Sequence, residues 1–481
     1  MSLWSAKDAA AATGGQAVGN WDINGISIDT RTIEAGDLFV ALKAARDGHE
    51  FVAQALAKGA GAALVSHIPN DVAQDAPLLI VDDVLSALED LGRAGRARTD
   101  ARVVAITGSV GKTSTKEMLR DVLGAQGRTH ASVASYNNHW GVPLTLARMP
   151  MDTEYAVIEI GMNHPGEIAP LAKMARPHVS LVTTVAAAHL EAFDNIEGIA
   201  AEKASIMEGL EPNGLAVLNA DVATAAILAK VAENLDVNAV WFGKKANEYT
   251  LENSVLKGNT TIVEANAMGA PLLFKVKSAG QHFAMNGLGA LACAQALGAD
   301  LALAAQSIAT WTPFTGRGAR EVIALDPADS RMTLELIDDA YNANPTSLSA
   351  ALDVLAAAEV THDIGRVSKG RRIAYLGDMK ELGPDEIAMH QAVAELPSIA
   401  QIDVVHCVGP LMRHCYDALP DAKKGHWSEH STEMAGFVGH DLDAGDVVLA
   451  KGSLSMGLSR VVDAVTKLGH TTPKTSEKDD V

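Results

Sequence analysis

Residues 107–113 read T-G-S-V-G-K-T and have the residue types and spacing of a phosphate-binding loop. A β-branched stretch, Val103–Ile106, precedes the loop, and a helical pattern over residues 114–124 follows it. In the order strand, glycine loop and helix, backbone N–H groups and the helix N-terminus converge on an anion. We therefore predict a bound nucleoside triphosphate, with Lys112 at its β- and γ-phosphates and Thr113 Oγ1 on Mg²⁺.

This loop is shorter than the general pattern G-x-x-x-x-G-K-[ST], which requires glycine where this chain has Ile106. The alternative is a chance glycine-rich turn between a strand and a helix. The Lys-Thr pair stands at the predicted helix start, which favours phosphate binding. The loop residues that we expect at the nucleotide are Gly108, Ser109, Val110, Gly111, Lys112, Thr113 and Ser114.

Three further residues with chemical potential lie in the same part of the chain. Glu159 stands near the carboxyl end of an apolar strand, where open α/β sheets bind ligands. A buried acid must be paired or hold a cation, so we favour Mg²⁺ there. His189 follows another apolar stretch and is either a ligand or a packed residue. Lys203, in a helical stretch, has the local sequence of an ordinary solvated lysine.

Amide side chains form two further candidate contacts. Asn137 and Asn138 precede a Gly-x-Pro turn, and their amides suit a phosphate or sugar as well as the turn itself. His282 and Asn286 share one face of a predicted helix. An amide at that place could read an adenine edge or cap the helix.

The last third of the chain adds a polar cluster. Arg317 stands between two glycines, which let a ligand approach closely. Asp338 and Asp339 end a strand, and Lys451 ends another. The polar residues that follow the acidic pair are Tyr341, Asn342 and Asn344.

The composition is that of a globular protein with several domains. The chain has 481 residues, of which 48% are hydrophobic, and this length is too great for one core. A net charge of −20 argues against a nucleic-acid partner. Three cysteines cannot form a disulfide framework here, and the His406–Cys407 pair fits strand-end packing better than zinc. With no signal-peptide or membrane-span pattern, we expect a cytoplasmic protein.

Short Val/Ile/Leu runs alternate with Ala-rich helical stretches, which is typical of α/β architecture. We predict domains at residues 1–98, 99–314 and 315–470, and a disordered polar tail at 471–481. The central domain should hold buried parallel strands. The predicted strands span residues 25–28, 37–42, 62–65, 78–81, 102–106, 155–160, 179–185, 214–218, 332–338, 372–376, 404–408 and 447–450.

Longer strings along nearly the whole chain resemble the Mur ligases, ATP-dependent amide-forming enzymes of peptidoglycan precursor synthesis. YNANP and LGDMKELG are the most discriminating, and they are similar to the family member that adds D-alanyl-D-alanine. The Asn-Pro-Arg signature of the member that adds diaminopimelate or lysine does not occur in the sequence. The other strings are SIDTRTIEAGDLFVAL, DGHEF, TGSVGKTSTKEM, YNNHWGVPLTL, VIEIGMNHPGEI, AAAHLEAF and KGS.

The resemblance implies three α/β domains: an N-terminal UDP-sugar-binding domain, a central P-loop ATPase-like parallel sheet and a C-terminal Rossmann-like domain for the incoming dipeptide. It implies a ligase that joins D-alanyl-D-alanine to UDP-N-acetylmuramoyl-tripeptide through an acyl phosphate and so forms the pentapeptide precursor. ATP and two Mg²⁺ ions would take part. The partners would be these small molecules alone, without nucleic acid or membrane, and the protein would be a monomer.

The resemblance also implies roles for single residues. Thr113, Glu159 and His189 would hold Mg²⁺, and Lys203 would be carbamylated by CO₂ and ligate the second ion. The catalytic set would be Lys112, Lys203, Glu159 and His189. Asn286 would contact adenine, Asp339 the ribose and Arg317 the phosphates. The substrate contacts would be Thr30, Arg31, His49, Asn137, Asn138, Tyr341 and Asn344.

Two departures from the family pattern leave questions open. Relatives usually carry Lys-Gly-Ser-Arg near the C-terminus, whereas Leu454 follows Ser453 here, and whether Arg460 substitutes is open. Ala44 stands where relatives often have glycine. Three alternatives remain: the ligase that adds the third amino acid, a P-loop switch ATPase without ligation, and an ATP-binding scaffold. The sequence does not distinguish meso-diaminopimelate from lysine at position three of the peptide.

Overall fold

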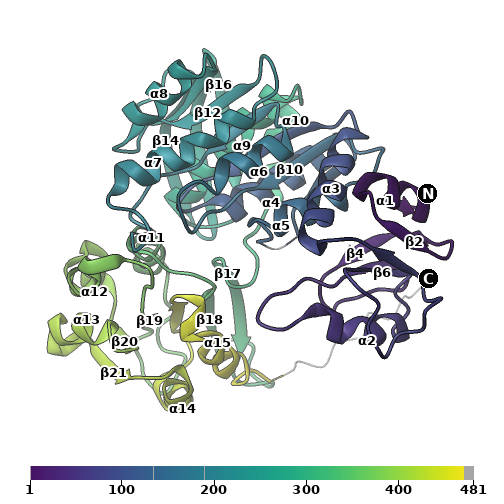
Figure 1. Ribbon diagram of the computed structural model, residues 1–481. Coiled ribbons are helices and arrows are strands. Elements are labelled where there is room, and N and C mark those ends of the chain that lie inside the picture. The colour runs from purple at the N-terminus through teal and green to yellow at the C-terminus, as the bar shows by residue number, and fades with distance from the viewer. Residues whose placement is uncertain (1, 134, 189, 471–481) are drawn as a thin grey trace, which may run out of the picture.

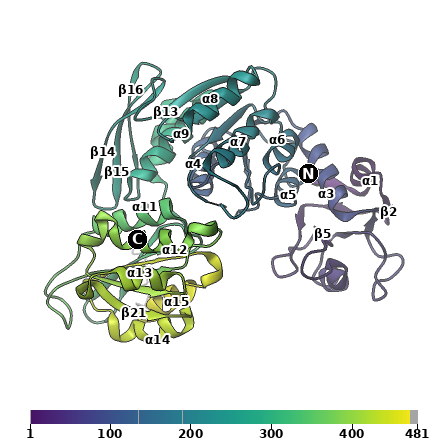
Figure 2. The same ribbon diagram turned by 60° about the vertical axis from the view of Figure 1, so that its left-hand side comes forward.

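The computed structural model describes residues 2–133, 135–188 and 190–470. Three α/β units follow one another along the chain (Figure 1). The central unit contacts the other two, which lie at separate ends of it (Figure 2). His189 and the expected tail, residues 471–481, lie outside the described residues. None of the helices in the described ranges is both long and apolar enough to cross a membrane.

The first unit contains a five-stranded sheet in the order β2-β7-β6-β5-β4. Only β2 runs antiparallel to its neighbour within this sheet. Its strands are β2 (Gln16–Val18), β4 (Gly25–Ser27), β5 (Asp37–Val40), β6 (Ala62–Val65) and β7 (Leu78–Ile80). A short antiparallel pair, β1 (Trp4–Ser5) and β3 (Asp22–Ile23), and the helices α1 (Ala6–Thr13), α2 (Val52–Ala57) and α3 (Val84–Ala97) complete the unit.

The central unit contains a nine-stranded sheet in the order β16-β15-β14-β13-β12-β11-β8-β10-β9. It is covered on both faces, because Val104 and Ile106 pack into one core while Val103 and Ala105 pack into the other. The strands are β8 (Arg102–Thr107), β9 (Thr129–Ala131), β10 (Tyr155–Glu159), β11 (Val179–Val182), β12 (Leu215–Asn219), β13 (Asn238–Gly243), β14 (Tyr249–Lys257), β15 (Thr260–Ala267) and β16 (Ala270–Val276). The helices are α4 (Lys112–Gly124), α5 (Gly141–Ala147), α6 (Ile168–Ala175), α7 (Ile196–Ala204), α8 (Ala225–Asn234), α9 (Gln281–Ala296) and α10 (Leu301–Ser307).

The central sheet is mostly parallel, as predicted, and it ends in an antiparallel extension that the prediction did not include. All neighbouring strands from β8 to β14 pair in parallel, but β15 runs antiparallel to both β14 and β16. The turns at Gly258 and Gly269, both with positive φ, reverse the chain. Buried and exposed residues alternate along β15 and β16, because one face of this extension meets solvent.

The third unit contains a six-stranded sheet in the order β17-β18-β22-β19-β20-β21, with only β17 antiparallel among these strands. The strands are β17 (Ala319–Ala324), β18 (Thr333–Asp339), β19 (Arg372–Gly377), β20 (Val404–Val408), β21 (Lys424–Ser428) and β22 (Val447–Lys451). The helices are α11 (Pro345–Ala356), α12 (Glu386–Ala392), α13 (Met412–Ala418), α14 (Ser431–Asp441) and α15 (Ser459–Thr466). Each predicted strand appears, with ends that coincide with the prediction or differ from it by up to three residues.

The two larger sheets direct their carboxyl ends toward the same space. Loops that follow β8, β10, β11 and β12 line a cavity from the central unit, and the ends of β18 and β22 line it from the third unit. Open α/β sheets bind ligands at such ends. The fold therefore gathers at one place polar residues that are more than 300 positions apart in the sequence, such as Lys112 and Lys451.

Candidate active site

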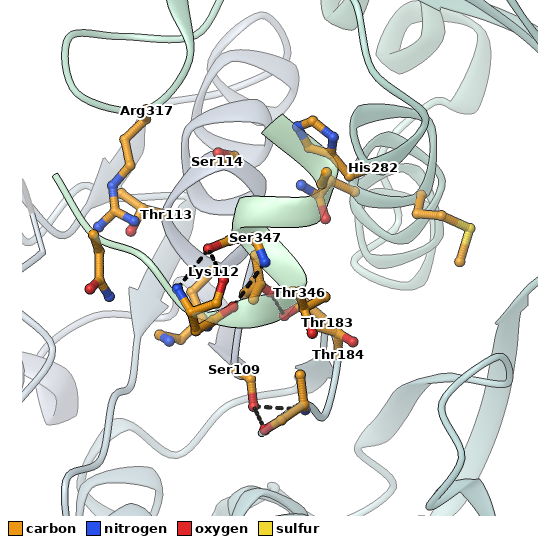
Figure 3. Close-up of a pocket in the computed structure, with 18 of the residues that line it drawn as sticks. Ser109, Lys112, Thr113, Ser114, Thr183, Thr184, His282, Arg317, Thr346 and Ser347 are labelled. Carbon is orange, nitrogen blue, oxygen red and sulfur yellow. Dashed lines mark hydrogen bonds between the residues drawn. The ribbon is translucent and has the colours of Figure 1, made fainter. Parts of the chain in front are cut away.

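The cavity between the central and third units has a volume of about 930 Å³. Figure 3 shows side chains of both units around it: Lys112, Thr113 and Thr183 from the central unit, and Arg317, Thr346 and Ser347 from the third. Its size is in the range of cofactor and small-molecule sites. All of the predicted phosphate-loop residues from Ser109 to Ser114 line it.

The phosphate loop is short because β8 extends through Thr107. Ile106 is therefore a fully buried strand residue, and the turn begins at Gly108, which explains the missing first glycine of the general pattern. Gly108 and Gly111 have φ values of +151° and +88°. A Cβ on Gly108 would lie 1.9 Å from Thr183 Oγ1, and one on Gly111 would lie 2.6 Å from Asn286 Oδ1. Both positions thus require glycine.

Helix α4 begins at Lys112, and its N-cap Gly111 offers no side-chain cap to the first N–H groups. Lys112 Nζ donates to Gly108 O at 2.6 Å and so folds back over the loop. Burial lowers the Lys112 pKa, while Glu159 opposes this shift and Arg317 adds to it. The loop thus presents N–H groups and an ammonium to an anion.

Glu159 ends β10 and is fully buried beside the start of α4. Its Oε1 accepts hydrogen bonds from Thr113 Oγ1 at 3.1 Å and from Asn137 Nδ2 at 2.8 Å. Its Oε2 is buried and has no hydrogen-bond partner among the described residues. A buried carboxylate oxygen without a partner, next to a hydroxyl oxygen, is an arrangement that suits a hard cation such as Mg²⁺.

Lys203 is buried with 1% of its surface exposed, so the expectation of a solvated lysine from its local sequence is wrong. It lies on α7, and its Nζ is 3.8 Å from Met162 Sδ. Burial, with a smaller contribution from the positive charge of Lys112, lowers its pKa well below the ordinary value. The neutral amine is therefore much easier to populate than in a solvated lysine.

Arg317 reaches across the cavity from the third unit. It stands between Gly316 and Gly318, whose φ values are +77° and +92°. Its guanidinium lies 4.2 Å from the centre of the Tyr341 ring, and its Nη2 is 3.4 Å from Ser135 Oγ. Its Nε is buried without a hydrogen-bond partner among the described residues.

Asp338 and Asp339, the two acids at the end of β18, have different contacts. Asp338 accepts from Gly316 N at 2.8 Å and thereby fixes the loop that carries Arg317. Asp339 lines the cavity and pairs with Lys451 Nζ at 2.7 Å. Burial raises the Asp339 pKa, and the charge of Lys451 opposes that shift. Lys451 also donates to Asn342 O at 2.9 Å, so both strand ends are tied together.

Helix α9 supplies His282 and Asn286 to the cavity, as predicted for one helix face. Burial lowers the His282 pKa to about 4, with Lys451 adding to the shift. His282 is therefore neutral at physiological pH. The contact between Asn286 and Gly111 places its amide directly beside the phosphate loop.

Comparison with known proteins agrees with this architecture. Three family models match: "Mur ligase family, catalytic domain" at residues 22–96, "Mur ligase middle domain" at 106–294 and "Mur ligase, glutamate ligase domain" at 328–454. The UDP-N-acetylmuramoyl-tripeptide–D-alanyl-D-alanine ligase of Escherichia coli is 38% identical over 80% of this chain and 81% of its own length. That of Rickettsia prowazekii is 30% identical over 96% of this chain and 99% of its own. The chain belongs to the Mur ligase family.

Solved structures of other Mur ligases have the same fold. MurF from Acinetobacter baumannii superposes with a TM-score of 0.81 at 29% identity and covers 96% of this chain and 99% of its own. MurF from Thermotoga maritima in complex with ADP has a TM-score of 0.75 at 25% identity and covers 92% of this chain and 97% of its own. The predicted family resemblance and the α/β fold class are therefore confirmed.

Three predicted substrate contacts of this Mur ligase lie outside the cavity, in the first unit. Both ring nitrogens of His49 are engaged: Nδ1 is 2.7 Å from Asp47 Oδ1, and Nε2 accepts from Ser66 N at 2.9 Å. Arg31 is exposed and pairs with Asp29. Thr30 Oγ1 donates to Gln54 Oε1 at 3.2 Å. Their proposed role at a UDP-sugar stays a prediction.

The predicted contacts Asn137, Asn138, Tyr341 and Asn344 do line the cavity. Two of them also cap helices, because Asn138 Oδ1 accepts from Gly141 N and Asn344 Oδ1 accepts from Ser347 N, each at 2.9 Å. Sequence reasoning missed Ser135, Thr183 and Thr184. Only the position of the two threonines just after an apolar strand could have indicated them.

Proposed function

We propose that this Mur ligase joins D-alanyl-D-alanine to UDP-N-acetylmuramoyl-tripeptide at the expense of ATP, giving the UDP-N-acetylmuramoyl-pentapeptide precursor. The observation that carries the proposal is the cavity. A phosphate loop faces a second unit that contributes Arg317 and the Asp339–Lys451 pair. Relatives with that enzyme name match most of the chain at 30–38% identity.

The reaction proceeds in two steps. The terminal carboxylate of the tripeptide attacks the γ-phosphorus of ATP, and ADP leaves, which forms an acyl phosphate. The amine of D-alanyl-D-alanine then attacks the acyl carbon, and inorganic phosphate leaves from the tetrahedral intermediate. No side-chain nucleophile is required. The protein contributes in-line positioning and charge neutralisation.

Two units of the protein supply that neutralisation. Lys112 would contact the β- and γ-phosphates from the central unit, and Arg317 would contact them from the third. Asn286, beside Gly111, would contact adenine, and Asp339 would accept from the ribose hydroxyls. Ser109, held by Ala186 O at 3.0 Å, keeps the loop in its phosphate-binding conformation.

We propose two Mg²⁺ ions, held by Thr113, Glu159, His189 and a carbamylated Lys203. Mg²⁺ supplies positive charge that stabilises the transferring phosphoryl group. The unpartnered Glu159 Oε2 fits a ligand role. The lowered Lys203 pKa favours the neutral amine, which is the form that reacts with CO₂. Carbamylation would convert a cation into an anionic oxygen ligand at this buried position.

The remaining assignments depend on this function. Residues 1–98 would hold the UDP-sugar through Thr30, Arg31 and His49. Residues 99–314 would bind ATP, and 315–470 would bind the dipeptide. The three cysteines are free and buried, which suits the reducing, ATP-containing cytoplasm. We also propose that the protein acts as a monomer.

The deciding experiment is a mass-spectrometric assay with ATP, Mg²⁺ and D-alanyl-D-alanine. The UDP-tripeptide is offered in two forms, with meso-diaminopimelate or lysine at position three. We expect the mass of the pentapeptide product from at least one form, and phosphate release only when both substrates are present. Phosphate release without a ligated product would instead support a switch ATPase and would contradict the proposal.

A further inference from the structure

Lys116 is a fully buried lysine that the proposed function does not use. It lies on α4, one helical turn after Lys112, and 0% of its surface is exposed. Its Nζ donates to Ser132 O at 2.8 Å and forms an ion pair with Glu117 Oε1 at 2.7 Å. Burying a charge is costly unless specific partners hold it, so a lysine at this depth indicates a role for its partners.

The ion pair with Glu117 offsets part of the cost of burying this charge, and Glu117 is shared with a second cation. Glu117 already forms an ion pair with Arg120 Nη1 at 2.6 Å, and 12% of its side chain is exposed. The bond to Ser132 has more consequences. Ser132 is itself buried, with 2% exposed, and immediately follows β9.

Ser132 is the first residue of a segment that surrounds the Glu159 carboxylate. Its Oγ accepts from the backbone N–H of Glu159 at 3.2 Å. Further along, Ser135 Oγ lies 3.4 Å from Thr113 Oγ1, and Asn137 Nδ2 donates to Glu159 Oε1. The Lys116 ammonium thus holds the beginning of the segment whose side chains contact both predicted oxygen ligands of Mg²⁺.

We propose that Lys116 is a positioning residue for the Thr113–Glu159 pair. By fixing Ser132, it sets where the Glu159 backbone lies and how Asn137 and Ser135 approach the two ligand side chains. Metal ligands depend on such outer partners, whose loss costs roughly 10- to 100-fold in metal affinity or activity. This inference rests on the proposed role of Thr113 and Glu159 as magnesium ligands.

The test compares Lys116→Met and Ser132→Ala with Lys173→Met, a control on α6 whose lysine side chain is 58% exposed and paired with Glu208. Mn²⁺ replaces Mg²⁺ as a spectroscopic probe, and its binding to the full-length protein with ADP is titrated by electron paramagnetic resonance. We expect Lys116→Met to weaken Mn²⁺ binding about tenfold or more. Ser132→Ala should weaken it in the same direction, and the control should match the wild type.

A second readout separates positioning from a merely structural role. In the ligation assay, Lys116→Met should raise the Mg²⁺ concentration for half-maximal rate and leave the KM for D-alanyl-D-alanine unchanged. A lower melting temperature with an unshifted Mg²⁺ dependence would overturn the inference. So would wild-type Mn²⁺ affinity in both variants. If Lys116→Met does not fold, Lys116→Gln is titrated in its place, with the same expected loss of Mn²⁺ affinity and the same contradicting outcome. Ser132→Ala keeps the carbonyl that Lys116 contacts, so it tests only the link from Ser132 Oγ to Glu159.

The proposed function and the proposed role of Lys116 can be contradicted independently of each other. Mn²⁺ titration with ADP requires no ligation, so it can succeed or fail whatever the natural substrates are. Absence of the pentapeptide product from the wild type would contradict the proposed function and leave the Mn²⁺ result standing.

Discussion

The central unit meets its two neighbours in different ways. Toward the first unit, packing is continuous: Leu144 and Ala147 of α5 belong to that unit's own core. Helix α3 approaches α5 so closely that a Cβ on Gly95 would lie 2.3 Å from Leu146 O. Toward the third unit, Ala279 packs in that unit's core, but the contact between the two units also encloses the 930 Å³ cavity.

The polar contacts differ in the same sense. Three arginines donate to backbone carbonyls across the first interface. Arg96 donates to Ala175 O and Arg98 to Met149 O, each at 2.9 Å, and Arg148 donates to Ile26 O at 2.6 Å. Across the second interface, the side-chain bonds in the described chain include Arg317–Ser135 at 3.4 Å and Asn259–Glu335 at 3.3 Å. The interface with the first unit is therefore closed by packing and hydrogen bonds of the protein itself. The interface with the third unit leaves space and polar groups for a ligand.

The sharpest test of the interface with the third unit is Lys112→Ala. We expect ligation to fall by about 10³-fold or more, because the charge at the β- and γ-phosphates is lost. The melting temperature of the ligand-free protein should stay near that of the wild type. Steady-state product formation and calorimetry measure both. Lys230→Ala, on the exposed surface of α8, is the matched control, and a folded Lys112→Ala variant with normal turnover would remove the phosphate-loop assignment.

Lys203→Ala should be nearly as inactive as Lys112→Ala, because the buried position would lose its anionic oxygen ligand. Acetate or another short carboxylic acid should restore part of the rate by occupying the vacated space. The rate is measured against acetate concentration at fixed ATP and Mg²⁺. Full activity without acetate would contradict carbamylation, as would a native mass of wild-type protein that does not respond to CO₂.

Arg96→Met probes the interface with the first unit. Arg96 is 3% exposed and donates to Ala175 O and Arg176 O, each at 2.9 Å. Loss of these bonds should lower the free energy of unfolding by about 2–4 kcal/mol while kcat stays unchanged. Urea unfolding provides the measurement. Arg93→Met, on the exposed side of the same helix, should cost less than about 1 kcal/mol; equal costs for both variants would refute the distinction.

A smaller effect should appear on acidification, within the third unit. His406 is buried, stacks on Tyr375, and has its pKa lowered to about 3 by burial, with His426 and Arg371 adding to the shift. The unfolded chain takes up this proton near pH 6.5, the folded chain only near pH 3. The contribution of His406 to the free energy of unfolding is therefore fully present above pH 6.5. It decreases as the pH falls below 6.5, by at most about 1.4 kcal/mol per pH unit.

His406→Gln should flatten that pH dependence. Urea unfolding of both proteins between pH 5 and 8 gives the two slopes, and the third unit is the part expected to respond. Equal slopes would show that His406 does not carry the effect.

Local sequence patterns were sufficient to predict the phosphate loop and the main buried strands of each unit, but not strands such as β9, β13–β17 and β21. The apolar runs of β8, β10 and β11 and the glycine loop before α4 were identified because strand alternation and turn chemistry are local properties. The carboxyl-end rule predicted that Glu159 faces a ligand, and the family resemblance implied the same for Asp339; both line the cavity.

Features that depend on contacts between distant segments could not be predicted from the sequence. Lys203 has the local pattern of a solvated helix residue, and only packing of α7 against the central sheet buries it. Ser135 reaches Thr113 and Arg317 from a loop with no strand or helix signal of its own. The antiparallel extension β14–β16 did carry an alternating signal, but its pairing partner is defined only by the folded sheet.

The unpartnered Glu159 Oε2 and Arg317 Nε have a thermodynamic consequence for how the protein unfolds. Neither atom has a hydrogen-bond partner among the described residues, and one group is anionic while the other is cationic, so a metal–nucleotide complex could satisfy both together. Such a ligand would link two units that, among the described residues, are joined by few side-chain hydrogen bonds. Heating should therefore melt the ligand-free protein in separable steps, with the third unit apart from the rest, and the nucleotide-bound protein in a single cooperative transition.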